Sequence, residues 1–126
     1  MNLYMEESRN YKSFTDMKVW QLAHRLSIEI FKLTLNLPKS EDYALTSQIR
    51  RSSNSVSANI AEAFGRSKKN DKNYFYTISR GSAYETQNHL LYGKGVGYFD
   101  AIQTETLFEE YSELIHQLNK IMKSLE

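Results

Sequence analysis

The amino-acid sequence predicts an all-α domain, an antiparallel up-and-down four-helix bundle. Apolar residues recur at spacings of three and four along four long segments, which is the repeat of a helix with one buried face. No segment alternates in the way that strands do. The segments are joined by short links, and short links favour neighbouring helices that run in opposite directions. We expect a flexible N-terminal arm at 1–13 and one bundle domain at 14–126, with helices at roughly 16–37, 42–64, 70–92 and 100–125.

The first two helices have clear boundaries in the sequence. Thr15 or Asp16 suits the first N-cap, and Pro38 ends that helix because proline disfavours helical backbone in the residue before it. The second helix is expected to start near Asp42 and to stop at Gly65, since glycine is a favourable C-terminal cap. The expected buried stripes are Val19, Trp20, Ala23, Leu26, Ile30, Leu33 and Leu37, then Leu45, Ile49, Ser52, Ser53, Val56, Ile60, Ala63 and Phe64.

The last two helices differ in the character of their stripes. Asn70 and Asp71 suit the start of the third helix, which the glycine-rich segment 93–97 is expected to break. Asp100 and Gln103 have the spacing of a capping box for the fourth helix. The third stripe is small and polar, and the fourth is regular and apolar: Tyr74, Phe75, Ile78, Gly81, Ser82, Glu85, His89 and Tyr92, then Leu107, Tyr111, Leu114, Leu118, Ile121 and Leu125.

Polar residues lie on or beside the stripes of the second and third helices, namely Gln48, Arg50, Arg51, Asn59, Glu62 and Glu85. A buried amide or charge is costly unless it is paired. We therefore expect a structural network that holds two closely packed helices in register, or a protomer interface. A ligand pocket at such an interface and a catalytic role are the alternatives. Asn59 shares a helical line with Leu45 and Ser52 and is expected to face the core.

Charge is unevenly distributed, although the formal net charge is only +1. Residues 50–80 carry seven basic side chains and two acidic ones, whereas residues 100–126 carry six acidic and two basic ones. A cluster of cations is expected at one end of the bundle, formed by Arg66, Lys68, Lys69 and Lys72. Repeated around the rim of an oligomer, this cluster would hold phosphates by charge. A solvated loop, or ion pairs with the acidic fourth helix of a neighbour, is the alternative.

Several classes of site are not supported by the sequence. The absence of cysteine excludes disulfides and thiolate metal sites and suits the cytoplasm. No apolar run reaches the ~20 residues of a membrane span, so we expect no membrane association. Glu113 and His116 have the Glu-x-x-His spacing of di-iron bundles, but Leu114 takes the inward position and a second motif is missing. We expect no metal, no cofactor and no enzymatic activity.

The nine tyrosines exceed what one bundle core accommodates. Six of them cannot all face a single narrow core, namely Tyr74, Tyr76, Tyr84, Tyr92, Tyr98 and Tyr111. Tyrosine is enriched at protein interfaces, so we expect several of them to line protomer contacts. Stacking on single-stranded bases is the alternative.

Five segments of the sequence, taken in order, resemble the family of 23S rRNA intervening-sequence proteins, which includes the accessory proteins of diversity-generating retroelements. The segments are DMKVWQ at 16–21, LTSQIRR at 45–51, NIAE at 59–62, GSAYETQ at 81–87 and GY at 97–98. The family usually has glycine after its Ala-Glu pair, where this chain has Ala63. The resemblance implies an all-helical protomer that assembles into a ring, commonly a pentamer. It also implies an association with nucleic acid and, for the retroelement members, with a reverse transcriptase.

The residues and the resemblance together predict a non-enzymatic, homo-oligomeric scaffold that binds RNA or DNA without sequence specificity. The basic rim is the expected binding surface, and a protein such as a reverse transcriptase is the expected second partner. The alternative is a protein-only module for self-assembly, in which the basic and acidic faces serve protomer contacts alone.

Overall fold

The computed structural model describes residues 11–126 and is helical throughout, with no strand in that range. Its four long helices are α2 (Lys18–Leu33), α3 (Leu45–Phe64), α4 (Lys69–Gly95) and α5 (Ala101–Ser124). Two short 3-10 turns, η1 (Phe14–Asp16) and η2 (Lys39–Glu41), precede α2 and α3. The predicted all-helical bundle of four helices is confirmed.

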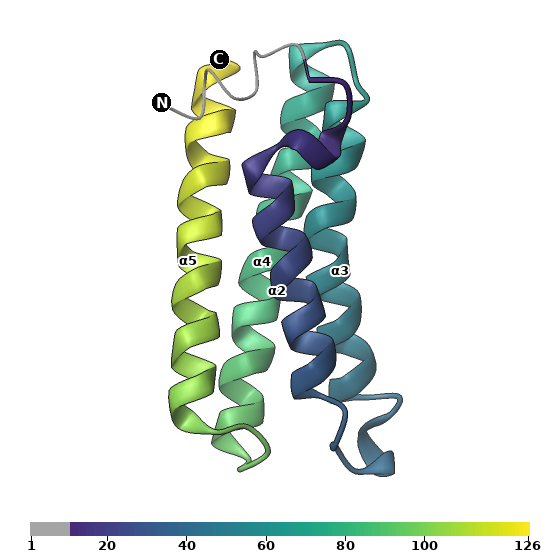
Figure 1. Cartoon of the computed structure of the whole chain (residues 1–126), viewed down its shortest axis with the longest axis vertical. Helices are drawn as coiled ribbons and strands as arrows, with labels where there is room; N and C mark the ends of the chain where they lie inside the picture. The colour runs from purple at the N-terminus through teal and green to yellow at the C-terminus, as the bar shows by residue number, and fades with distance from the viewer. Residues whose placement is uncertain (1–10) are drawn as a thin grey trace.

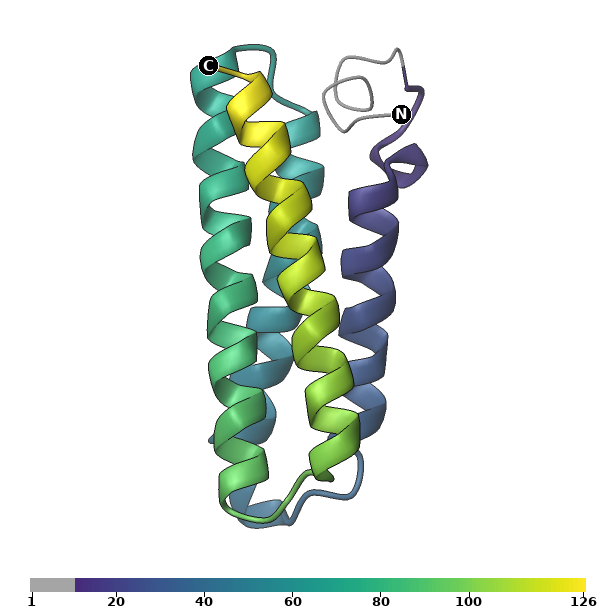
Figure 2. The same cartoon turned by 90° about the vertical axis from the view of Figure 1, so that its left-hand side faces the viewer.

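The helices lie along one long axis, and each connection joins neighbours at one end of the bundle (Figure 1). From the upper end of that view, α2 leads down, α3 returns, α4 leads down again and α5 climbs back. The upper end therefore holds the α3–α4 connection and the C-terminal end of α5, as Figure 2 also shows. The lower end holds the other two connections. Helices α2 and α4 each pack against both α3 and α5, and the α3–α4 pair is the most extensive.

Three of the four predicted stripes form the core. The buried apolar residues of α2, α3 and α5 fall on the predicted lines and include Val19, Ala23, Leu26, Ile30, Leu45, Ile49, Val56, Ile60, Leu107, Leu114, Leu118 and Ile121. These side chains supply the main stabilising term, since each large apolar side chain contributes about 1.5–3 kcal/mol on full burial. An ion pair between Arg25 and Glu110 also links α2 to α5.

The predicted buried face of α4 is wrong. The helix buries Tyr76, Ser79, Ala83, Thr86, Gln87, Leu90 and Gly93, whereas Tyr74, Gly81, Glu85 and Tyr92 are exposed. The reason is that small polar side chains of α4 are buried through hydrogen bonds to α3. Ser79 Oγ donates to the Val56 carbonyl at 2.8 Å, and the hydroxyls of Ser52 and Thr86 are 2.8 Å apart. Tyr76 takes the apolar position in place of Tyr74.

Helix α2 ends at Leu33, about one turn before the predicted end at Leu37. The Thr34 hydroxyl donates to the Ile30 carbonyl at 2.9 Å and accepts from Arg50 Nε at 2.8 Å. Bonding of a hydroxyl to the carbonyl four residues earlier competes with continuation of the helix. The chain therefore turns before it reaches the proline.

Helix α3 begins at Leu45, three residues after the predicted start at Asp42. Its first N–H group is capped from outside the helix, because the Leu45 amide donates to Glu41 Oε1 at 3.2 Å. The other carboxylate oxygen of Glu41 accepts a hydrogen bond from the Tyr98 hydroxyl at 2.9 Å. Glu41 thus joins the start of α3 to the α4–α5 connection.

Neither Thr15 nor Asp16 is the N-cap of α2, which is Met17 and forms no side-chain cap hydrogen bond. Both residues belong to η1, which Ser13 caps. The Ser13 hydroxyl accepts from the Thr15 amide, and Asp16 completes a capping box. Tyr11 is half-buried against the core, so packing begins before Phe14. Of the predicted arm at 1–13, residues 1–10 lie outside the described range.

Helix α4 continues through Gly93 to Gly95 instead of breaking at Gly93. The ring of Phe99 covers the Gly93 backbone and fills the space where a side chain would be. Asp100 then caps α5 as predicted, because its carboxylate accepts from the Gln103 amide at 2.9 Å.

Candidate functional site

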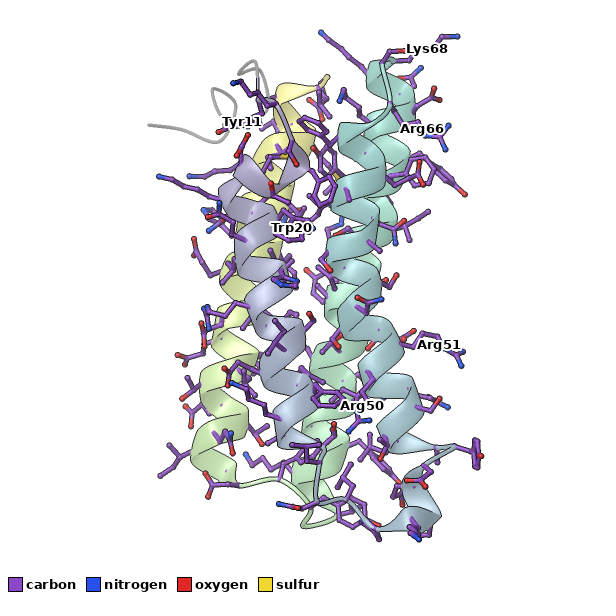
Figure 3. All side chains as sticks on the ribbon, turned by 45° about the vertical axis from the view of Figure 1, so that its right-hand side comes forward. Tyr11, Trp20, Arg50, Arg51, Arg66 and Lys68 are labelled. Atoms are coloured by element: carbon purple, nitrogen blue, oxygen red, sulfur yellow. The ribbon has the colours of Figure 1, made fainter. Side chains whose placement is uncertain are left out.

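The four predicted phosphate-binding cations lie together at the upper end of the bundle. Arg66 and Lys68 belong to the α3–α4 connection, and Figure 3 shows both at this end. Lys69 and Lys72 lie in the first turn of α4. The local fold explains the grouping, because α3 ends at Phe64 and α4 starts five residues later, at Lys69.

Two of these cations already have partners within the protomer. Arg66 Nη2 is 3.1 Å from Glu62 Oε2, and its guanidinium carbon lies 4.6 Å from the centre of the Phe75 ring. Lys72 Nζ donates to the carbonyls of Ala63 at 3.1 Å and Phe64 at 3.3 Å. Lys72 therefore satisfies carbonyl groups at the end of α3, where Gly65 is the C-cap as predicted and its amide donates to the carbonyls of Ala61 and Glu62.

The other two cations, Lys68 and Lys69, are exposed. Lys68 is the N-cap residue of α4 and forms no side-chain cap hydrogen bond. The first N–H groups of a helix have no partner within the helix and carry a partial positive charge, which favours anions. Asp71 in the first turn offsets part of that charge. The exposed ammonium groups and the uncapped helix start give this end of α4 a positive character.

Asn59 belongs to a polar contact between α3 and α4, although it does not face the core as predicted. It is half-buried, and its Nδ2 donates to the carbonyl of Ser55 at 2.8 Å and to the Ser55 hydroxyl at 3.0 Å. Ser82 Oγ of α4 donates to the same Ser55 hydroxyl at 2.9 Å. The Ser55 hydroxyl therefore links the Asn59 amide to Ser82 of α4 by hydrogen bonds.

The remaining members of the predicted network lie outside this contact. Gln48, Arg51, Glu62 and Glu85 are exposed, and Arg51 points away from the bundle in Figure 3. Arg50 turns toward α2 instead and lies 4.4 Å from the centre of the Phe31 ring. A role for these residues at a protomer interface stays a prediction.

Sequence reasoning missed the hydroxyl groups that form most of the network. Besides the Ser52–Thr86 and Ser55–Ser82 pairs, Gln87 Nε2 donates to the Phe108 carbonyl and to the Ser112 hydroxyl, both at 2.9 Å, which links α4 to α5. The signal was present in the sequence as serine and threonine at helical spacing in both α3 and α4.

The surface formed by residues 11–126 includes two hollows between helices. One, of about 360 Å³, lies between α2 and α3 and includes Ile28, Phe31 and Arg50 in its lining. The other, of about 280 Å³, lies between the start of α3 and α4 and includes Gln48, His89 and Tyr92. His89 Nε2 is buried without a hydrogen bond, 3.8 Å from Glu85 Oε2.

As predicted, the tyrosines do not all face the core. Tyr76 and Tyr111 are fully buried, whereas the exposed ones include Tyr74, Tyr84 and Tyr92. Burial raises the pKa of Tyr111 far above its ordinary value, and Tyr111 Oη has no hydrogen-bond partner within the described chain.

Residues 11–126 contain no group of three or more histidine and acidic side chains that could hold a metal ion. Glu113 and His116 are both exposed, as the inward position of Leu114 predicted. Within the same range, no helix combines the length and the apolar character of a membrane span.

Comparisons with known proteins agree with the resemblance in the sequence. A crystal structure of a protein of unknown function from the S23 ribosomal protein family of Bacteroides thetaiotaomicron has a TM-score of 0.75 and 25% sequence identity, covering 83% of this chain and 98% of that one. No curated protein matches the chain. The model of the family described as 23S rRNA-intervening sequence protein matches residues 15–120. The chain therefore belongs to the 23S rRNA-intervening sequence protein family.

Proposed function

We propose that the protein is a non-enzymatic, oligomeric scaffold that holds RNA or DNA through charge, without reading its sequence. The observation that carries this proposal is the exposed pair Lys68 and Lys69 beside the uncapped start of α4. Lysine ammonium groups and helix N–H groups contact phosphate oxygens, and such contacts carry no sequence information. Arg66 and Lys72 add to the positive field at this end, although their side chains are engaged.

One protomer offers too few cations for firm binding, so the proposal includes an oligomer. In a ring, which is commonly a pentamer in the proteins that this chain resembles, the lysine pairs would recur along one rim. Each phosphate neutralised adds to the affinity and to its dependence on salt. A longer strand could then contact several protomers at once.

Exposed apolar side chains support self-assembly. Ile28, Phe31 and Leu35 are exposed along α2 and just beyond its end, and Leu91, Val96 and Ile102 are exposed near the α4–α5 connection. These two surfaces differ, and contact between two different surfaces of identical subunits generates a closed ring when the rotation closes. We place the scaffold in the cytoplasm, and a protein such as a reverse transcriptase is the further partner in this proposal.

The second candidate is a module for self-assembly that has no role with nucleic acid. The same exposed apolar residues favour it, as do the internal partners of Arg66 and Lys72. In this case Lys68 and Lys69 would meet acidic groups of a neighbouring copy or face solvent.

The double variant Lys68→Glu with Lys69→Glu separates the two candidates. Its matched control is Lys39→Glu with Lys94→Glu, which makes the same change in charge at the lower end, where both lysines are exposed. The scaffold proposal predicts that only the first variant loses retention of a short RNA while its oligomeric state is kept. Equal retention by both variants would refute phosphate binding at α4. Loss of the oligomer in the first variant alone would assign the lysines to a protomer contact.

A further inference from the structure

We infer that Tyr74 is a stacking platform for an unpaired base, and that the ligand of the upper end is therefore single-stranded RNA or DNA rather than a duplex. This inference rests on the proposed function and goes one step beyond it. Charge alone holds any phosphate backbone, whereas an aromatic ring beside the cations selects a strand whose bases are accessible.

The first observation is that Tyr74 is exposed and yet held by its neighbours. Its side chain is 62% exposed on α4, although the sequence pattern predicted burial. Its ring meets the half-buried Phe75 ring at a centroid distance of 5.1 Å and an angle of 89°. Phe75 in turn packs against the core and against the Arg66 guanidinium, which is fixed by Glu62. This support limits the freedom of the Tyr74 ring, so less conformational entropy is lost when a base stacks on it.

The second observation is the position of Tyr74 relative to the lysine pair. Residues four apart on a helix lie on the same face, so Tyr74 follows Asn70 by one turn, about 6 Å along the axis. Lys69 directly precedes Asn70 at the start of α4, and Lys68 is the N-cap. Lys69 is five residues before Tyr74, about 7.5 Å along the axis and about 140° around it, so a strand bound to the lysines reaches the ring by crossing the end of α4 past Asn70.

The charges around Tyr74 are consistent with an anionic ligand. The α3–α4 connection and the first turn of α4 carry Arg66, Lys68, Lys69 and Lys72, against the carboxylates of Glu62 and Asp71. Asp71 lies three residues before Tyr74 on the same side of α4, and the end of α5 adds Lys123 and Glu126. Glu62 is paired with Arg66. In a duplex the bases are stacked inside the helix and present only their edges, so a ring at the end of a protein helix reaches a base face only in an unpaired strand.

Tyr84 provides a matched control on the same helix. It is 55% exposed, close to the value for Tyr74, but lies ten residues further along, about 15 Å beyond Tyr74 and about 22 Å from Lys69 along the helix axis. The nearby Arg80 donates to Asn119 of α5 at 2.8 Å, so that cation is already engaged. Loss of the Tyr84 ring removes a comparable exposed aromatic group that has no lysine pair beside it.

The test measures binding of the full chain by fluorescence anisotropy. The probes are a short labelled RNA of mixed sequence, the DNA of the same sequence, and the duplex of each. Binding is measured at two or more salt concentrations. We expect Tyr74→Ala to weaken binding of both single strands roughly 5- to 150-fold, the loss that removal of one stacking ring typically causes. Duplex binding and the salt dependence should stay unchanged. Tyr74→Phe should retain single-strand binding, and Tyr84→Ala should resemble the wild type.

Each other outcome has a defined meaning. If Tyr74→Ala binds single strands as tightly as the wild type while Lys68→Glu with Lys69→Glu does not bind, the charge-based function stands and stacking is refuted. If Tyr74→Ala weakens single strands and duplexes equally, the ring has no preference for unpaired bases and the inference fails. A wild-type protein that binds none of the four probes would overturn the proposed function itself. Thermal melts of each variant establish that the fold is retained.

Discussion

Replacement of Gly93 by alanine tests the packing of the lower end of α4. An added Cβ would lie 2.2 and 2.3 Å from two ring carbons of Phe99, which is far inside van der Waals contact. Phe99 is only 5% exposed, so its ring has little room to move aside. The amides of Tyr98 and Phe99 both donate to the Gly93 carbonyl, at 2.8 and 3.2 Å, which also fixes the backbone at this point.

The expected change in the free energy of unfolding is the sum of two opposing contributions. Glycine in a helix is less favourable than alanine by about 1 kcal/mol, so the substitution would stabilise an unhindered helix. Overpacking of a buried site typically costs about 1–3 kcal/mol. Because the contact here is a hard overlap with a buried ring, we expect Gly93→Ala to lower the free energy of unfolding by about 1–2 kcal/mol.

Gly81 on the same helix is the matched control. An added Cβ there would meet no atom within 4 Å, and the residue is exposed. Gly81→Ala should therefore raise the free energy of unfolding by up to about 1 kcal/mol. Chemical denaturation at one protomer concentration measures both variants, since the stability of an oligomer depends on concentration.

A double-mutant cycle with Phe99 tests whether its ring causes the clash. In a Phe99→Ala background, Gly93→Ala should become neutral or stabilising, because the atoms that it meets are gone. If Gly93→Ala is as stable as Gly81→Ala in the wild-type background, Phe99 does not cover Gly93 and the account of this end is refuted.

Three further substitutions test single contacts. Asn59→Ala removes both Nδ2 hydrogen bonds to Ser55 and should lower the free energy of unfolding by about 1 kcal/mol; an unchanged thermal melt would show that the amide is solvated. Tyr111→Phe should be neutral or stabilising by about 1 kcal/mol, because it deletes a buried hydroxyl that has no protein partner in the described chain; a large loss in a thermal melt would reveal a hydrogen bond. The hydrogen bond to Glu41 raises the pKa of Tyr98 above its ordinary value, so the stability that it confers is present below about pH 10 and lost as pH rises through the folded pKa. Tyr98→Phe should remove that part of the pH dependence in melts recorded from pH 8 upward, and an unchanged profile would contradict the link.

The regular helices were predictable because their contrast between apolar and polar faces is strong. Helix α5 keeps Leu107, Tyr111, Leu114, Leu118 and Ile121 on one line, and all five are buried. A period of this kind depends on the local sequence alone, so no knowledge of the neighbouring helices is needed.

The face of α4 could not be predicted in the same way. Its aromatic residues lie on both sides of the helix, and Tyr76 is buried while Tyr74 is exposed. Its buried hydroxyls at Ser79 and Thr86 are favourable only because α3 supplies partners for them. A sequence pattern records polarity but not the partner that compensates for it.

The residues of the candidate site were predictable from the sequence. Which of these cations have partners within the chain was not. The grouping of Arg66, Lys68, Lys69 and Lys72 follows from their positions in one connection. The engagement of Lys72 with the carbonyls of Ala63 and Phe64 depends on how α4 turns back against α3. Only the structure separates the two exposed lysines from the two engaged cations.

Light scattering on a sizing column, with and without a short mixed-sequence RNA at low and high salt, tests the central claim most directly. The account predicts an oligomer of fixed mass that gains RNA at low salt and releases it at high salt, while Lys68→Glu with Lys69→Glu keeps the mass and gains none. An oligomer that takes up no RNA at either salt concentration would contradict the charged scaffold and favour the self-assembly module. A monomer under all conditions would contradict both.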